Sequence, residues 1–295
     1  MNKTIFRGTC TAMITPFTED GIDFPALEKQ IEYQIRNGIE ALCILGTTGE
    51  APTITDEEYD KIAKFSYDKI AGRVKFILGS GSNCTKTAIE KSQFAQKVGA
   101  DGLLVVTPYY NKCTQKGLVK YYNDICNNVD IPVLCYNVPA RTGVNILPAT
   151  MEEIAEHKNI GGIKEACGNM EQICETARRI RGKTALYSGD DNLNLAMLSI
   201  GSMGLISVAS NVAPKEVSNV AKLYFAGKNE QATILQEKLL PLIDIMFCEV
   251  NPIPVKKAIE LIGLGKGILR APLTELEEEH QKEMISILKN YKFEV

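Results

Sequence analysis

Short apolar runs alternate along this chain with longer segments in which apolar residues recur at helical spacing. Eight runs rich in Val, Ile, Leu and Gly predict strands, at residues 8–15, 41–46, 75–80, 101–107, 132–137, 160–165, 185–190 and 203–210. Amphipathic helices are predicted between them, for example at 24–38, 55–72, 85–100 and 170–182. Each strand-plus-helix unit therefore takes roughly 20 to 35 residues.

This alternation predicts a closed parallel barrel. Strands that are buried on both faces read as continuous apolar runs, and short strand-to-helix connections favour parallel crossovers. We therefore expect an α/β fold, a (β/α)8 TIM barrel over residues 1–225 that carries the catalytic site. An open doubly wound sheet is the alternative, but it would need a glycine fingerprint after the first strand, where the chain reads TPFTEDG.

The last part of the chain has helical periodicity and no strand-like run. Residues 226–295 contain apolar residues at helical spacing in three segments, 229–249, 255–263 and 274–291. We expect a C-terminal helical extension that packs on the barrel or on another subunit.

Composition narrows the classes of partner. With 45% hydrophobic and 23% charged residues, the chain is typical of a globular protein with a large core. The 33 basic and 36 acidic residues nearly balance and form no long run of like charge, so we expect no nucleic-acid partner. No apolar stretch approaches the roughly 18 residues that span a bilayer, so we expect no membrane partner.

Cysteine and histidine usage limits the chemistry further. The nine cysteines are scattered without a CxxC pair, which is typical of free thiols in a reducing, cytoplasmic compartment. His157 and His280 both lie in charged, helix-like contexts. A histidine-rich metal centre and a Ser/His/Asp triad are therefore not expected. Asp190 and Asp191 alone are a weak metal signal, so we predict neither a metal nor a cofactor.

In a TIM barrel the active site forms where the strands end, so these positions carry the candidate residues. The second strand is followed by GTTGE, residues 46–50, which places Thr47 and Thr48 in a glycine-bounded turn. Backbone N–H groups exposed in such a loop can hold a small anion. An ordinary strand-to-helix turn is the alternative for this segment.

Tyrosines and an arginine follow the fourth and fifth predicted strands. Tyr109, Tyr110 and Tyr136 lie at or next to these strand ends. A phenol can donate and accept protons where histidine is scarce, although tyrosines beside strands are commonly amphipathic core residues. Arg141 offers a planar guanidinium suited to a carboxylate, with an ordinary surface charge as the alternative.

The sixth predicted strand carries a lysine, Lys164, near its end, after an apolar, glycine-rich run. Burying an ammonium group costs several kcal/mol unless it is paired, so burial favours the neutral amine that can attack a ketone. Together with the anion loop and the phenols, this position favours a catalytic role over a solvated surface lysine. Gly189 would let backbone approach a ligand closely and Ile206 could wall one side, although both could equally serve barrel packing.

Seven motifs, in order and approximate spacing, resemble those of the dihydrodipicolinate synthase family, a branch of the pyruvate-dependent class I aldolases. They are GTTGE, TPYYN, YNVPARTG, GIKEA, SGDD, GLISV and NPIPVK, and they cover nearly the whole chain. GTTGE and GIKEA alone are typical of the wider group, which includes N-acetylneuraminate lyase. YNVPARTG is the narrower signal because it keeps Arg141.

The resemblance implies a set of catalytic residues. Lys164 would form a Schiff base with pyruvate, and Tyr136 would transfer protons to and from that adduct. Tyr136 would be linked through Thr47 to Tyr110, which reaches in from a neighbouring subunit in this family. The implied reaction is the condensation of pyruvate with L-aspartate 4-semialdehyde, in diaminopimelate and lysine biosynthesis.

The resemblance also implies how the substrates and subunits are held. Thr48 and the backbone around it would bind the pyruvate carboxylate, with Ile206 as a further contact. Arg141 would recognise the carboxylate of aspartate semialdehyde. Members of the family are commonly homotetramers built as dimers of dimers, and Tyr109 would lie at the dimer contact.

Two other functions stay open at this point. The same imine chemistry could act on a different aldehyde, as in sialic acid or keto-deoxy-sugar lyases, although Arg141 favours aspartate semialdehyde. A non-catalytic barrel that senses a keto acid is the second alternative, but pure binding needs no nucleophilic amine.

Feedback by lysine is expected to be weak or absent. Lysine-inhibited members of the family carry a characteristic set of residues at the dimer interface. Asp56, Tyr59 and Thr87 do not match that set, although Asn83 and Tyr109 do.

Overall fold

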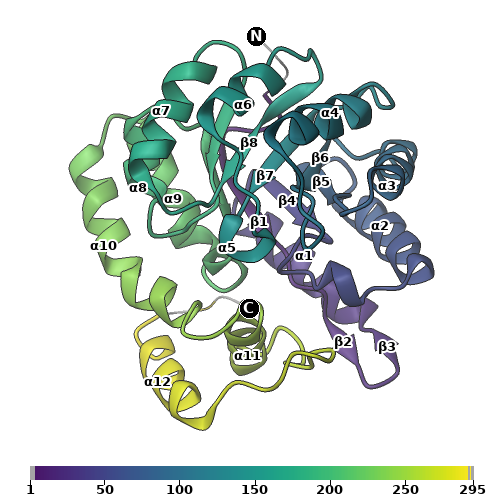
Figure 1. Ribbon diagram of the computed structural model, residues 1–295. Helices are drawn as coiled ribbons and strands as arrows, with labels where there is room; N and C mark the ends of the chain where they lie inside the picture. Colours follow the sequence, from purple (N-terminus) through teal and green to yellow (C-terminus); the bar gives the residue numbers. More distant parts are fainter. Residues whose placement is uncertain (1–3, 292, 294–295) are drawn as a thin grey trace. The chain divides into compact units, whose positions relative to one another are not determined.

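The eight predicted strands form a closed parallel barrel. A computed structural model describes residues 4–291 and 293, and its strand order is β1-β10-β9-β8-β7-β6-β5-β4 (Figure 1). The predicted (β/α)8 TIM barrel is confirmed, and the open doubly wound sheet is excluded. The barrel strands are β1 (Gly8–Ala12), β4 (Ala41–Ile44), β5 (Lys75–Gly79), β6 (Gly102–Val106), β7 (Val133–Asn137), β8 (Ile160–Glu165), β9 (Ala185–Ser188) and β10 (Gly204–Ser207).

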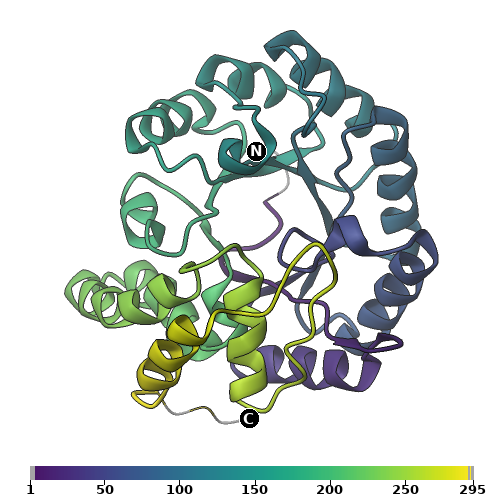
Figure 2. The ribbon, with the colours of Figure 1, turned by 60° about the horizontal axis from the view of Figure 1, so that its bottom comes forward.

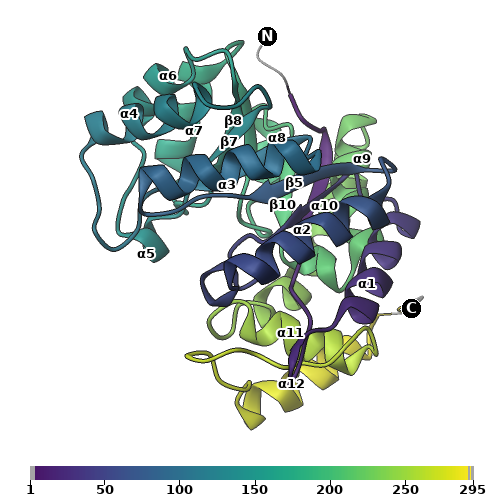
Figure 3. The same cartoon turned by 90° about the vertical axis from the view of Figure 1, so that its right-hand side faces the viewer.

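The chain divides into two compact units, and the first comprises residues 75–206 with the N-terminal residues up to Arg7. It contains the parallel strands β5 to β9 and the start of β10. Successive helices pack against one another along the outer side of these strands (Figures 1 and 3). These helices are α3 (Thr85–Val98), α4 (Gln115–Cys126), α6 (Pro148–Ile154) and α7 (Met170–Ile180), with the short α5 (Pro139–Thr142) and α8 (Asn194–Ser199) beside strand ends.

The register of β7 and β8 determines which side chains meet. Val133 lies opposite Ile160, but Leu134 lies opposite Gly162, so β8 carries one extra residue at this point. A Cβ atom on Gly162 would lie 2.7 Å from the Ala185 carbonyl oxygen, so only glycine fits between the neighbouring strands here. This β-bulge shifts the remaining pairs by one residue. It therefore places Lys164 opposite Tyr136.

The second unit comprises residues 8–74 and the chain from Ser207 onwards. Its strands β1 and β4 pair in parallel, with Cys10 opposite Ala41. Its helices include α1 (Phe24–Arg36), α2 (Asp56–Ile70) and α9 (Pro214–Phe225), with 3-10 turns at η1 (Ala51–Thr53) and η2 (Ala209–Asn211). An antiparallel hairpin of β2 (Phe17–Thr18) and β3 (Gly21–Ile22), which the sequence pattern did not predict, follows β1.

The second unit also contains the helices α10 (Asn229–Ile245), α11 (Ile253–Leu261) and α12 (Glu278–Leu288). Helix α10 packs on α9, and α12 contacts both α10 and α11 (Figure 2). The division into a barrel over 1–225 and an extension over 226–295 stays a prediction. In the described part of the chain, no helix is both long enough and apolar enough to cross a membrane.

Candidate active site

Lys164 and Tyr136 form the centre of the candidate site in the first unit. They face each other across β8 and β7, and the Lys164 Nζ lies 4.4 Å from the centroid of the Tyr136 ring. Both side chains are buried, with Lys164 only 5% exposed. The strand pairing thus brings together an amine and a phenol that the sequence placed on separate strand ends.

Gly189, the residue after β9, is packed directly against the lysine. A Cβ atom at this position would lie 3.0 Å from the Lys164 Cε and 2.7 Å from the Ala166 Cβ. The next residue, Asp190, is largely buried, and burial raises the pKa of its carboxyl to about 6, an effect that the positive charge of Lys164 opposes. The side of Lys164 that faces β9 is therefore tightly enclosed, with an acidic group close by.

Glu165, beside Lys164 on β8, lies in a buried hydrogen-bond network. Its carboxyl accepts from the Asn137 amide at 2.9 Å and from the Cys167 backbone N–H at 3.0 Å. Asn137 also donates to Asn145, whose side chain in turn bonds Gln172 of α7. Burial nevertheless raises the pKa of Glu165 to about 7. These hydrogen bonds join the ends of β7 and β8 to helix α7.

The GTTGE loop lies in the second unit and is fixed by polar contacts. Thr48 is buried, whereas Thr47 is partly exposed. The Asn251 amide Nδ2 donates to Thr48 Oγ1 at 3.0 Å, and Thr15 Oγ1 donates to the Gly49 carbonyl at 2.7 Å. The segment is therefore a side-chain-supported turn rather than a bare connection.

A buried ion pair completes this loop, and the sequence analysis missed it. Glu50 and Lys256 form a salt bridge in which both side chains are essentially inaccessible. Burial lowers the pKa of Lys256 to about 8, while the Glu50 carboxylate acts in the opposite direction. Lys256 Nζ also donates to the Ile268 carbonyl at 2.7 Å, and the Arg270 backbone N–H donates to Glu50 at 3.0 Å. The available signal was the charge of Lys256 inside the apolar run IPVKKAI.

The other predicted site residues have diverse environments. Tyr110 is 91% exposed, on a loop where its φ of +68° is left-handed, and Tyr109 is partly buried. Arg141 is exposed in α5, just beyond β7. Ile206 is fully buried in β10.

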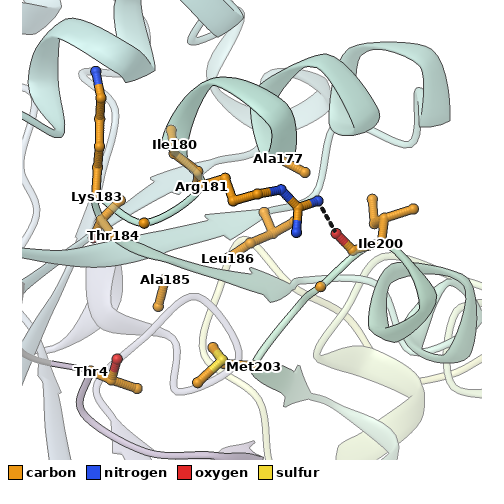
Figure 4. Close-up of a pocket in the computed structure, with 12 residues that line it drawn as sticks. Thr4, Ala177, Ile180, Arg181, Lys183, Thr184, Ala185, Leu186, Ile200 and Met203 are labelled. Atoms are coloured by element: carbon orange, nitrogen blue, oxygen red, sulfur yellow. Dashed lines mark hydrogen bonds between the residues drawn. The ribbon is translucent and has the colours of Figure 1, made fainter. Parts of the chain in front are cut away.

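A separate cavity of 150 Å³ lies in the first unit near Ala185, the first residue of β9 (Figure 4). Lys164 lies near the other, carboxyl ends of the strands. Arg181 at this cavity donates to the Ile200 carbonyl at 3.4 Å, and Lys183 pairs with Glu152 and Glu156. Its basic groups already have protein partners, so this cavity is a weaker candidate than the Lys164 region.

The fold and these residues define a class, that of a parallel (β/α)8 barrel with a buried amine and a phenol at adjacent strand ends. Residues 5–291 match the Dihydrodipicolinate synthetase family. The chain is 46% identical to the 4-hydroxy-tetrahydrodipicolinate synthase of Alkaliphilus oremlandii, over 97% of this chain and 98% of that protein.

Solved structures give the same result. The dihydrodipicolinate synthase of Aquifex aeolicus is 42% identical, with a TM-score of 0.95 over 98% of this chain and 99% of that one. A structure described as the first monomeric dihydrodipicolinate synthase variant is 41% identical, with a TM-score of 0.95 over 97% and 96% of the two chains. The chain belongs to the dihydrodipicolinate synthase family, which confirms the resemblance of its motifs.

Proposed function

We propose that this protein is a Schiff-base lyase that condenses pyruvate with L-aspartate 4-semialdehyde to 4-hydroxy-tetrahydrodipicolinate, in lysine and diaminopimelate biosynthesis. The buried amine of Lys164, 4.4 Å from the Tyr136 ring centroid, is the observation that carries this proposal. Membership of the family and relatives named for this activity support it.

The first half of the reaction forms a nucleophile from pyruvate. The Lys164 amine attacks the ketone carbon, and the adduct takes up a proton and loses water to give a protonated imine. Loss of a proton from the methyl group then gives an enamine, because the cationic nitrogen accepts the electron pair. Tyr136 is the group proposed to move these protons, since its ring lies against the amine. This chemistry uses only the amine, the phenol and water, without a cofactor or a metal.

The second half joins the two substrates. The enamine carbon attacks the aldehyde carbon, and the alkoxide formed takes a proton by way of Tyr136. The amino group of the condensed aspartate semialdehyde then attacks the imine carbon and displaces Lys164. Ring closure therefore releases the product and restores the free amine.

The remaining roles follow from the matching motif positions. Thr48 and its backbone would hold the pyruvate carboxylate, with Ile206 and the backbone at Gly189 as further substrate contacts. Arg141 would bind the carboxylate of the aldehyde. Arg141 is exposed in α5.

Subunit contacts are part of the proposal. Tyr110, linked to Tyr136 through Thr47, would act on a neighbouring subunit in a homotetramer built as a dimer of dimers. The 91% exposure of Tyr110 is consistent with a role outside its own protomer. The Tyr109 contact and the cytoplasmic location also stay predictions.

Trapping with borohydride tests the central step. Reduction in the presence of pyruvate should fix a three-carbon acid on Lys164, visible as a mass increase on the peptide that contains it. Lys164→Ala should abolish both the adduct and turnover. The control Lys158→Ala, which removes a lysine two residues before β8 begins, should change neither. No adduct on Lys164 in the active protein would refute the assignment.

Substrate comparison separates the alternatives. Coupled turnover of pyruvate should be fast with aspartate semialdehyde and slow with N-acetylmannosamine or sugar-derived aldehydes. Preference for a sugar aldehyde would favour a sialic acid or keto-deoxy-sugar lyase. Pyruvate binding without any turnover would favour a sensor.

A further inference from the structure

The side chain of Asn251 contacts the loop that we propose holds the pyruvate carboxylate. Asn251 is buried between α10 and α11, and its Nδ2 donates to the Thr48 Oγ1 at 3.0 Å. The two residues are 203 positions apart in the chain. This contact therefore connects the C-terminal helical region to the turn after β4.

The donors and acceptors of the two side chains show which group donates in this hydrogen bond. A threonine hydroxyl has one proton to donate and two lone pairs that accept. The Asn251 N–H occupies a lone pair of Thr48 Oγ1, so the Thr48 proton is not donated to the Asn251 nitrogen. Within residues 4–291 and 293, Thr48 donates this proton to no protein acceptor. The Thr48 hydroxyl therefore has a proton that it can donate to a ligand.

A second contact holds the same loop two residues further on. Lys256, five residues after Asn251, forms the buried salt bridge to Glu50. Glu50 has a left-handed φ of +54°, and the Arg270 backbone N–H also donates to its carboxylate. The segment from Asn251 to Lys256 thus fixes the loop at Thr48 and again at Glu50. A donor held at two points loses little entropy when a ligand binds.

We infer that Asn251 is a positioning residue that keeps the Thr48 hydroxyl turned as a donor toward the carboxylate of pyruvate. This inference rests on the proposed function, because it assumes that Thr48 binds that carboxylate. Asn251 itself acts only through Thr48.

Replacing Asn251 with aspartate gives the sharpest test, because the two side chains have nearly the same shape. An ionised aspartate can only accept hydrogen bonds, so it would take the Thr48 proton and add a negative charge near the bound carboxylate. Asn251→Leu removes the contact without adding charge. We therefore expect the KM for pyruvate to rise about 100-fold in Asn251→Asp and about five- to tenfold in Asn251→Leu.

The turnover number distinguishes positioning from general damage. Both variants should keep kcat within about threefold of the parent at saturating pyruvate, because the lysine and the phenol are unchanged. Asn159→Leu is a matched control. Asn159, just before β8, is as buried as Asn251. Its amide, however, donates to the carbonyls of Cys126 and Val129. This control should lower the melting temperature and leave the KM for pyruvate unchanged.

A double-mutant cycle completes the test. Thr48→Val removes the hydroxyl and should raise the KM for pyruvate about 10- to 100-fold. In that background, Asn251→Leu should add less than a twofold change, because its effect passes through the missing hydroxyl. If Asn251→Leu does not fold, Asn251→Ala replaces it in the same cycle.

The outcomes separate the two proposals. An unchanged KM in Thr48→Val would remove Thr48 from pyruvate binding and so refute that part of the proposed function. A raised KM in Thr48→Val with an unchanged KM in both Asn251 variants would refute only the inference about Asn251. Equal effects of Asn251→Leu with and without the Thr48 hydroxyl would also refute it.

Discussion

Lys164 lies directly opposite Tyr136 in the parallel pairing of β8 and β7, with its Nζ 4.4 Å from the centre of the phenol ring. The pairing depends on the bulge between Val133 and Leu134. If β8 paired with β7 one to one, without the bulge, Tyr136 would lie opposite Ile163 and Lys164 would lie opposite Asn137. The backbone register therefore determines whether the amine and the phenol meet.

Removing the phenol should slow proton transfer and spare the structure. In Tyr136→Phe the ring still packs against Lys164, but the hydroxyl is lost. We expect kcat to fall by a factor of about 10² to 10⁴, the range typical of a lost general acid–base group. Stopped-flow or steady-state assays would measure this, with circular dichroism to check the fold. Parent-like turnover would exclude Tyr136 from the chemistry.

Gly189 should not tolerate a side chain. The Cβ atom of Gly189→Ala would lie 3.0 Å from the Lys164 Cε and would displace the amine. We expect a loss of about 10² in kcat, since a small displacement of a reacting group has effects of that size. Overpacking should also cost about 1–3 kcal/mol in urea unfolding. Gly117→Ala, within helix α4, is the control and should keep full activity.

Removing only one partner of the buried Glu50–Lys256 ion pair should strongly lower the free energy of unfolding. Lys256→Met leaves the Glu50 carboxylate buried without its cation, so the free energy of unfolding should fall by about 3–5 kcal/mol. Replacing Glu50 by leucine in the same protein should restore part of that loss. Lys257→Met removes the neighbouring lysine, which pairs with Glu260 on a more exposed surface, and should cost less than about 1 kcal/mol. Equal losses for the two lysines would contradict the prediction.

Acid should weaken the bond between Glu58 and Arg270. The Arg270 guanidinium holds the pKa of Glu58 at about 2, below the ordinary value for glutamate. Because the folded pKa is depressed, the stabilisation is fully present above about pH 5 and is lost as the pH falls toward 2. We expect Glu58→Gln to cost about 2 kcal/mol at pH 7 and much less at pH 3, since the side chain is 21% exposed and partly screened.

Urea unfolding at a series of pH values would measure this difference. Glutamine can still accept the capping hydrogen bond from the Thr55 N–H, so the comparison isolates the charge. Glu57→Gln, one residue earlier in α2, is the matched control. Its exposed pair with Lys61 should give no comparable pH-dependent difference. A cost for Glu58→Gln that does not vary with pH would exclude the electrostatic explanation.

Lysine should inhibit this protein weakly or not at all. The family resemblance implies that lysine-inhibited members carry other side chains at the positions of Asp56, Tyr59 and Thr87. Tyr59 is buried in α2. We expect most of the activity to remain in millimolar lysine, measured at pyruvate concentrations near its KM. Strong inhibition at low lysine concentration would overturn this prediction.

Most of the barrel could be predicted from the sequence because its strands are buried on both faces. The run from Ile160 to Glu165 in β8, for example, is buried throughout, and its run of apolar residues predicted the strand. Lys164 is the penultimate residue of the same run, and its position near the strand end pointed to the site. Local patterns therefore sufficed for elements whose burial is continuous.

Features that depend on distant or very short segments could not be predicted in this way. The β2–β3 hairpin has only two residues in each strand, too few to show alternation. Glu50 and Lys256 are 206 positions apart, and charged residues are ordinarily solvated, so their burial left no local pattern. The bulge in β8 could not be predicted either. Two adjacent glycines in a strand do not show how that strand pairs with its neighbour.

The single extra residue in β8 has a consequence for redesign. Side chains alternate between the two faces of a strand, so a β8 of the same length that paired one to one with β7, without the bulge, would turn the Lys164 amine to the other face of the sheet, away from Tyr136. The connections outside the strands could change length without moving it. Grafting this chemistry into another barrel thus requires transferring β7 and β8 together, bulge included, rather than two side chains alone.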